Sequence, residues 1–125
     1  MSPGKENGER TARGVPRVTE VRREIRKVAS PERAQINRWF FKTGRGEYGE
    51  GDRFLGVTLP ALRRIARAYQ SLPLADVVRL LKSPWHEERL LSLLMLVGQY
   101  GRADDRHRRR IHRAYLRNTR YINNW

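Results

Sequence analysis

Apolar residues recur at steps of three and four along most of this chain, and no stretch alternates apolar and polar residues as a half-buried strand would. The clearest stripes consist of Val18, Val21, Ile25 and Val28, and of Leu62, Ile65, Ala66 and Tyr69. This spacing brings the apolar side chains to one side of an α-helix. The sequence therefore predicts an all-α fold.

Two Ser-Pro pairs mark places where helices are expected to begin. In Ser30-Pro31 and Ser83-Pro84, a residue that caps helix N-termini precedes a proline. Proline fits the first helical position because the N–H that it lacks would have no helical partner there. Further helices are expected to begin at Pro60, at Leu74 and at Asp104-Asp105.

Residues 90–97 are apolar at every position except Ser92. A helix that is apolar on nearly all sides is usually buried, so this helix is predicted to be the most buried element. Gly98 and Gly101 are expected to mark its C-terminal end.

Short antiparallel helices around a buried one predict stacked helix pairs of the HEAT type. The sequence does not repeat a motif literally, so a compact bundle of four or five helices is the alternative. Residues 1–16 are rich in Gly, Pro and charge, and they are expected to form a flexible arm. Residues 17–125 are expected to form one helical domain.

The chain is strongly basic, with 27 Lys and Arg against 13 Asp and Glu and a net charge of +14. Residues 102–120 alone hold eight arginines and two aspartates. Polyanions bind such surfaces because each neutralised phosphate releases condensed counterions. The charge indicates DNA, RNA or an anionic membrane surface as partner, or else a surface that is merely well solvated.

The arginines of that segment also recur at steps of three and four, so they can align on one side of a helix. The row comprises Arg102, Arg106, Arg109, Arg113, Arg117 and Arg120. The forked donors of arginine match phosphate oxygens in charge and in geometry. The row is therefore predicted to bind phosphates, and a solvated helix face is the alternative.

Gly44–Gly49 matches the G-x-G-x-x-G motif of dinucleotide-binding sites, but its context does not. That motif needs a strand before it and a helix that opens at its third glycine. Here a helical pattern precedes the motif, and the next helix begins only at Pro60. The acids Glu47, Glu50 and Asp52 would also repel a pyrophosphate, so no nucleotide cofactor is expected.

The three histidines, His86, His107 and His112, lack the spacing of a metal site and are expected to be solvated helix residues. No metal is therefore predicted. Glu87 and Glu88 lie near the positive end of a helix, where they are expected to interact with its dipole and to form ion pairs. No pair of acids has a spacing that specifies catalysis.

The chain contains no cysteine, which excludes disulfides and thiolate chemistry and fits a reducing compartment. The longest apolar run, residues 90–97, is too short to cross a bilayer. Residues 1–10 lack the apolar stretch of a secretory signal. The sequence therefore predicts a cytoplasmic protein without a membrane span.

Several segments together resemble the DNA alkylation repair family of HEAT-like alkylpurine DNA glycosylases. The segments are Phe41–Val57, which contains the glycine-rich loop, Pro60–Ala66, Ser83–Leu91 and Asn118–Trp125. The resemblance covers roughly residues 30–125. Its most specific parts are the glycine-rich loop and the Asn-Asn-Trp that ends at Trp125.

This resemblance implies an α-α superhelix of HEAT-like antiparallel helix pairs whose concave face holds duplex DNA. It also implies hydrolysis of the N-glycosidic bond of N3- and N7-alkylated purines. Such a purine is cationic and already a good leaving group, so a carboxylate and tryptophan faces can stabilise the developing oxocarbenium ion. The resemblance implies that Trp125 contacts the lesion. The candidate DNA contacts are Lys42, Tyr48, Arg106, Arg109, Arg113, Arg117 and Arg120.

In this family the catalytic aspartate is expected one helical turn after the tryptophan, and therefore beyond Trp125. Residues 17–125 are accordingly expected to be the N-terminal part of a truncated domain that does not excise bases alone. Further C-terminal helices are expected to pack on residues 84–125. A non-catalytic helical nucleic-acid-binding module is the alternative function.

Overall fold

A computed structural model of the protein describes residues 15–40 and 51–122, and within these two ranges it contains helices and no strand. The helices are α1 (Val18–Lys27), α2 (Pro31–Phe40), α3 (Leu59–Ala68), α4 (Leu74–Leu81), α5 (His86–Arg102) and α6 (Asp105–Arg117), followed by the 3-10 turn η1 (Thr119–Tyr121). The all-α prediction is confirmed. Most of the arm expected at residues 1–16 lies outside the described residues, and the stacking of helix pairs into a superhelix stays a prediction.

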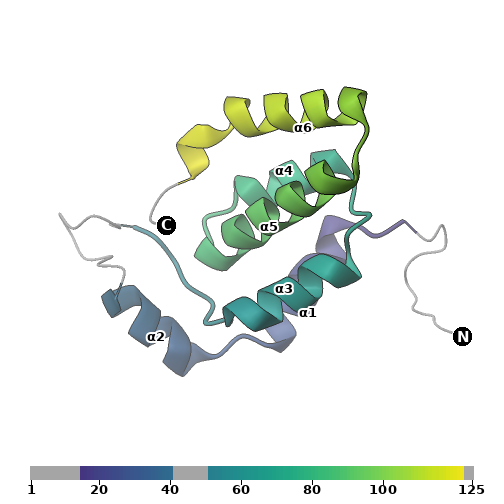
Figure 1. The fold of residues 1–125 in the computed structure, drawn as a ribbon. Helices are drawn as coiled ribbons and strands as arrows, with labels where there is room; N and C mark the ends of the chain where they lie inside the picture. The colour runs from purple at the N-terminus through teal and green to yellow at the C-terminus, as the bar shows by residue number, and fades with distance from the viewer. Residues whose placement is uncertain (1–14, 41–50, 123–125) are drawn as a thin grey trace, which may run out of the picture.

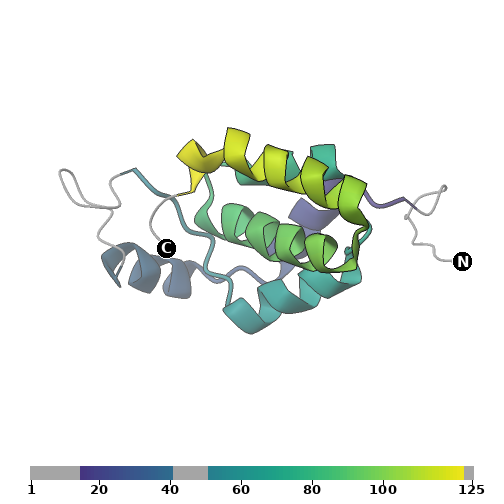
Figure 2. The same cartoon turned by 45° about the horizontal axis from the view of Figure 1, so that its top comes forward.

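Helix α5 is the centre of the arrangement, with α3, α4 and α6 packed against it (Figure 1). Figure 2 shows α5 between α3 on one side and α6 on the other. Helix α1 packs on α3 and α4. Helix α2 lies at the edge of the molecule and buries only Ala34. The surface that α5 forms with α3 and the surface that it forms with α6 therefore lie on different sides of α5.

One cluster of buried apolar side chains holds α1, α3, α4, α5 and α6 together. Its completely buried members are Val21, Ile25, Leu62, Val77, Leu80, Leu81 and Leu91. Burial of an aliphatic side chain contributes about 1.5–3 kcal/mol, so this cluster is the main source of stability. Within the described residues no helix is both long enough and apolar enough to cross a bilayer.

Two of the predicted helix starts are confirmed by capping hydrogen bonds. The Ser30 hydroxyl accepts a hydrogen bond from the backbone N–H of Arg33 at 3.3 Å, and α2 begins at the next residue. The Thr58 hydroxyl accepts from the backbone N–H of Ala61 at 3.3 Å, so α3 begins one residue before Pro60. Such caps satisfy N–H groups that have no partner inside the helix.

The predicted start of α5 is wrong, and its end lies one residue beyond the predicted Gly101. The helix begins at His86, because the Ser83 hydroxyl accepts a hydrogen bond from the Trp85 N–H at 3.0 Å instead of capping it. At the other end, α5 continues through Gly98 to Arg102. A glycine inside a helix costs about 1 kcal/mol, and the packing of the apolar side of α5 offsets this cost.

Helix α5 has the largest set of buried side chains, as predicted, but it is not buried on all sides. Val97 is 74% exposed, and Leu93 and Leu94 are half-buried. Its first turn instead buries four polar residues, His86–Arg89. An apolar outer strip on α5 is therefore left open in the described part of the chain.

Asp104 caps α6 as predicted, and its cap depends on pH. Hydrogen bonds from the backbone N–H and then from the ring of His107 hold the pKa of Asp104 below its usual value of 3.8. A carboxyl group with a lowered folded pKa contributes stability that is complete above its unfolded pKa and is lost as pH falls through the folded pKa.

We therefore expect the first turn of α6 to loosen only below about pH 4. Amide hydrogen exchange of His107, corrected for its intrinsic rate, measures this effect. In Asp104→Asn the protection should no longer change with pH. Protection that is independent of pH in the unchanged protein would contradict this assignment.

Candidate nucleic-acid interface

The side chains of α6 lie on three different sides of the helix. One side packs on the core through Ile111 and Ala114. A second side borders an open apolar depression of about 200 Å³ between α5 and α6, lined by Leu96, Val97, Tyr100, Ile111, His112 and Tyr115. The third side carries exposed arginines, namely Arg106, Arg109, Arg110, Arg113 and Arg117. The three- and four-residue spacing in the sequence thus corresponds to an amphipathic helix whose outer side is basic.

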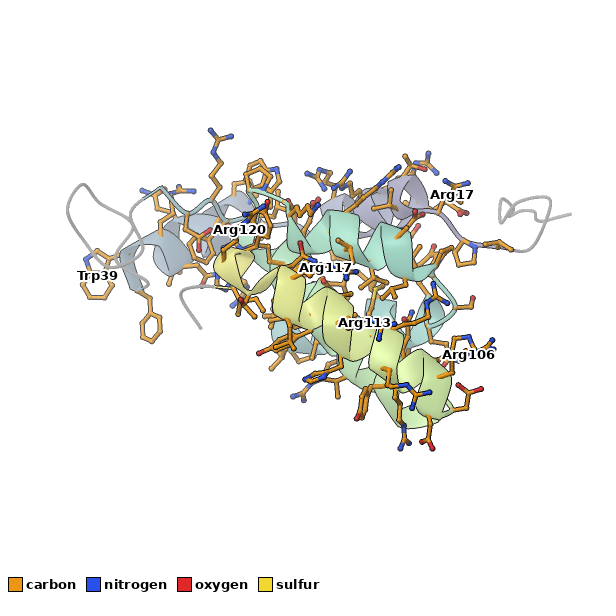
Figure 3. The ribbon with its side chains drawn as sticks, turned by 90° about the horizontal axis from the view of Figure 1, so that it is seen from above. Arg17, Trp39, Arg106, Arg113, Arg117 and Arg120 are labelled. Atoms are coloured by element: carbon orange, nitrogen blue, oxygen red, sulfur yellow. The ribbon has the colours of Figure 1, made fainter. Side chains whose placement is uncertain are left out.

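Figure 3 shows Arg106, Arg113, Arg117 and Arg120 following one another along α6 and η1. The alignment expected from the sequence is therefore present, and the exposed arginines 106, 109, 113, 117 and 120 are called the α6 row below. Arg102 does not belong to it. That residue ends α5, and its guanidinium donates to the carbonyl oxygen of Gln70 at 3.2 Å.

Within residues 15–40 and 51–122, no carboxylate forms an ion pair with a member of the α6 row. Asp104, the acid at the start of α6, pairs with His107 at 2.8 Å. Arg120 lies over the ring of Tyr121, with its guanidinium carbon 5.0 Å from the ring centroid. The row is therefore a line of cations whose charge is available to an external anion.

The arginines of α1, in contrast, are partly neutralised. Glu88, which is buried, lies 2.6 Å from Arg26 and 3.2 Å from Arg22. Asp76, also buried, lies 3.3 Å from Arg17. The ion-pair role expected for Glu88 is confirmed. These arginines hold α1 against α4 and α5, so they are weaker candidates for phosphate contact than the α6 row.

His86 was expected to be a solvated helix residue, and this prediction is wrong. Its ring is buried, stacks on Phe54 with 4.5 Å between the ring centroids, and lies 3.1 Å from the Asp52 carboxylate. Asp52 also pairs with Arg89 at 2.7 Å. His107 and His112 are exposed as predicted. Among the described residues, no group of three potential ligands could hold a metal ion.

Glu87 has a role that the sequence did not indicate. Its buried carboxylate accepts hydrogen bonds from three consecutive backbone N–H groups, those of Leu55, Gly56 and Val57, at 2.8, 2.8 and 3.2 Å. It therefore fastens the segment before α3 to the first turn of α5, where the helix dipole also favours a negative charge.

Three candidate residues lie outside the described part of the chain, namely Lys42, Tyr48 and Trp125. The same holds for the glycine-rich motif Gly44–Gly49. Their predicted contacts with DNA and with the lesion stay predictions. Of the candidate DNA contacts, the structure thus brings together only the α6 row.

Comparison with curated proteins found no match, and comparison with solved structures found none either. A family model described as "DNA alkylation repair enzyme" matches residues 21–125. This match confirms the family resemblance, supports a role in DNA repair and indicates a DNA substrate. Because the match covers most of the sequence, the chain belongs to the DNA alkylation repair enzyme family.

Proposed function

We propose that this protein binds duplex DNA through the α6 row and acts in the removal of N3- and N7-alkylated purines by hydrolysis of their N-glycosidic bond. The observation that carries the DNA contact is the α6 row itself, which is exposed and forms no ion pair with a carboxylate among the described residues. Phosphate groups neutralise such a row and release condensed counterions. The family match supports DNA as the polyanion.

The chemistry of this reaction needs little from the protein beyond positioning and charge. An alkylated purine carries a positive charge and leaves readily, so the developing oxocarbenium ion is what must be stabilised. In this proposal Trp125 faces the lesion, while Lys42 and Tyr48 contact the DNA. The support for these three residues is the family resemblance alone.

The apolar side of α6 supports a further part of the proposal. Val97, which lines the depression between α5 and α6, is exposed, and so is Leu116 on α6. An apolar surface of this kind usually marks an interaction site. We take it as the surface on which further helices of the same domain pack against residues 84–125, extending the helix pairs into a superhelix.

An excision assay with duplex DNA that contains 7-methylguanine tests the proposed activity. The assay reports binding of the duplex as well as release of the base, and the proposed function requires tighter binding of the methylated duplex than of the unmodified duplex. Release of 7-methylguanine from the methylated duplex would demonstrate the proposed hydrolysis directly. Binding that is equal for methylated and unmodified duplex would favour the non-catalytic module instead.

A further inference from the structure

A second basic surface lies on the side of α5 away from α6. There α3 and α5 border an open groove with a volume of about 180 Å³. Its lining residues are Arg63, Arg67, Gln70 and Arg102, together with Ala66, Leu94, Met95 and Gly98. This α3–α5 groove therefore combines three guanidinium groups with an apolar floor.

The three arginines line the same groove, and no acid lies near them in the sequence. No Asp or Glu occurs in residues 53–75 or 89–103. Arg63 and Arg67 are four residues apart, so they lie on the same side of α3. Three cations that line one groove repel each other, and an anion between them would relieve this repulsion.

Arg102 is held in position before any ligand arrives. Its Nη2 donates to the carbonyl oxygen of Gln70 at 3.2 Å. Gln99 donates to the same oxygen at 3.3 Å and to the carbonyl oxygen of Leu72 at 2.8 Å. These bonds tie the end of α5 to the segment that follows α3, so less side-chain entropy is lost when Arg102 binds an anion.

Gly98 keeps the floor of the groove open. A Cβ atom built on Gly98 would meet only Arg102 Nη1, at 3.5 Å, which is ordinary contact distance. A ligand can therefore approach the backbone of α5 at this point. The adjacent floor is apolar through Leu94 and Met95, and such a floor suits the C–H groups of a sugar rather than a fully hydrated ion.

We infer that the α3–α5 groove binds the sugar–phosphate backbone of a DNA strand. Phosphates lie against Arg63, Arg67 and Arg102, and deoxyribose lies over the apolar floor. This inference rests on the proposed function, since it takes DNA as the ligand. It adds a contact surface separate from the α6 row, on the opposite side of α5.

Arginine footprinting on the unchanged chain tests the groove directly. Phenylglyoxal modifies exposed guanidinium groups, and mass spectrometry reports which of them a bound duplex protects. Protection of Arg63, Arg67 and Arg102 is expected, and millimolar inorganic phosphate alone should not reproduce it. Protection by phosphate alone would reveal a site for free anions and would overturn the inference.

The same footprint separates the two proposals. If DNA protects the α6 row and leaves the groove arginines reactive, the groove inference fails while the proposed DNA contact of α6 stands. If DNA protects the groove alone, the inference stands and the α6 contact fails. If the duplex does not bind, both fail.

Substitutions provide the quantitative test. Arg63→Gln with Arg67→Gln should weaken duplex binding about tenfold for each lost phosphate contact near 0.1 M salt, and should reduce the salt slope by about 1.8. Arg23→Gln with Arg79→Gln is the matched control, because both residues are exposed and the same net charge is removed. If both pairs of substitutions weaken duplex binding equally, the effect is one of net charge, and the inference that the α3–α5 groove binds DNA is overturned.

Gly98 gives a test that leaves the charge unchanged. Gly98→Leu should fill the floor of the groove and weaken binding several-fold without changing the salt slope. Gly98→Ala adds only a methyl group at contact distance and should bind as the unchanged chain does. Circular dichroism checks that both variants are folded. Unchanged binding by a folded Gly98→Leu variant would contradict the groove as a backbone site.

Discussion

Replacement of Glu87 by alanine should lower the free energy of unfolding by about 3–5 kcal/mol. The carboxylate accepts the backbone N–H groups of Leu55, Gly56 and Val57, and it is buried. Each buried donor left without an acceptor costs about 1–3 kcal/mol. The total free energy of unfolding of a domain of this size is only about 5–15 kcal/mol, so the variant should be close to unfolding at ambient temperature.

Urea denaturation followed by circular dichroism measures this loss. Glu24→Ala is the control, because the Glu24 carboxylate forms only an exposed ion pair with Lys27 at 2.9 Å and should change stability by less than about 1 kcal/mol. The loss of stability in Glu87→Gln should lie between those of Glu87→Ala and Glu24→Ala, because glutamine keeps one acceptor oxygen. A loss below about 1 kcal/mol for Glu87→Ala would show that the three hydrogen bonds contribute little.

Gly56→Ala should destabilise the protein to a similar degree, because a side chain at this position would clash with backbone atoms. Gly56 has φ +83°, and a Cβ atom there would lie 1.9 Å from the carbonyl oxygen of Ser30 and 2.7 Å from the backbone nitrogen of Ala34. Both are backbone atoms, so the start of α2 would have to move. We expect a loss of about 3 kcal/mol or more, measured as a fall in Tm.

Gly51→Ala is the matched control for this substitution. Gly51 has nearly the same φ, +84°, but a Cβ atom there has nothing within 4 Å. The stability of Gly51→Ala should fall only by the cost of a left-handed conformation for alanine, about 1–2 kcal/mol. An equal loss at both glycines would show that φ alone, and not the close approach to Ser30, makes Gly56 necessary.

These two substitutions act on one joint of the fold. Segment 52–57 leads into α3, and it is fastened to the first turn of α5 by Glu87 and by the pairing of Asp52 with Arg89. The same segment accepts two hydrogen bonds from the Ser30 N–H, at the start of α2. The joint therefore sets where α2 lies relative to the core, although α2 buries only Ala34.

Features that depend on neighbours along the chain were predictable. The all-α fold follows from the apolar stripes, and the caps Ser30 and Asp104 act within three residues of themselves. The alignment of the α6 row likewise follows from the helical period. The family resemblance added Trp125, Lys42 and Tyr48, which lie outside the described residues.

Features that join distant segments were not predictable from one sequence. Glu87 accepts hydrogen bonds from N–H groups 30 to 32 positions earlier, and His86 is buried because Phe54 and Asp52 contact it. Nothing in the local pattern around His86 indicates these partners. The α3–α5 groove was missed for the same reason, because Arg63 and Arg102 come from different helices.

The most direct test of the account is the salt dependence of duplex DNA binding. The logarithm of the binding constant should fall steeply and linearly with the logarithm of the salt concentration, by about 0.9 for each phosphate contacted. Changing Arg106, Arg109, Arg113 and Arg117 to glutamine should reduce that slope by up to about 3.6. A duplex affinity that does not change with salt, or a slope that survives loss of these four arginines, would contradict the α6 row as a phosphate-binding surface.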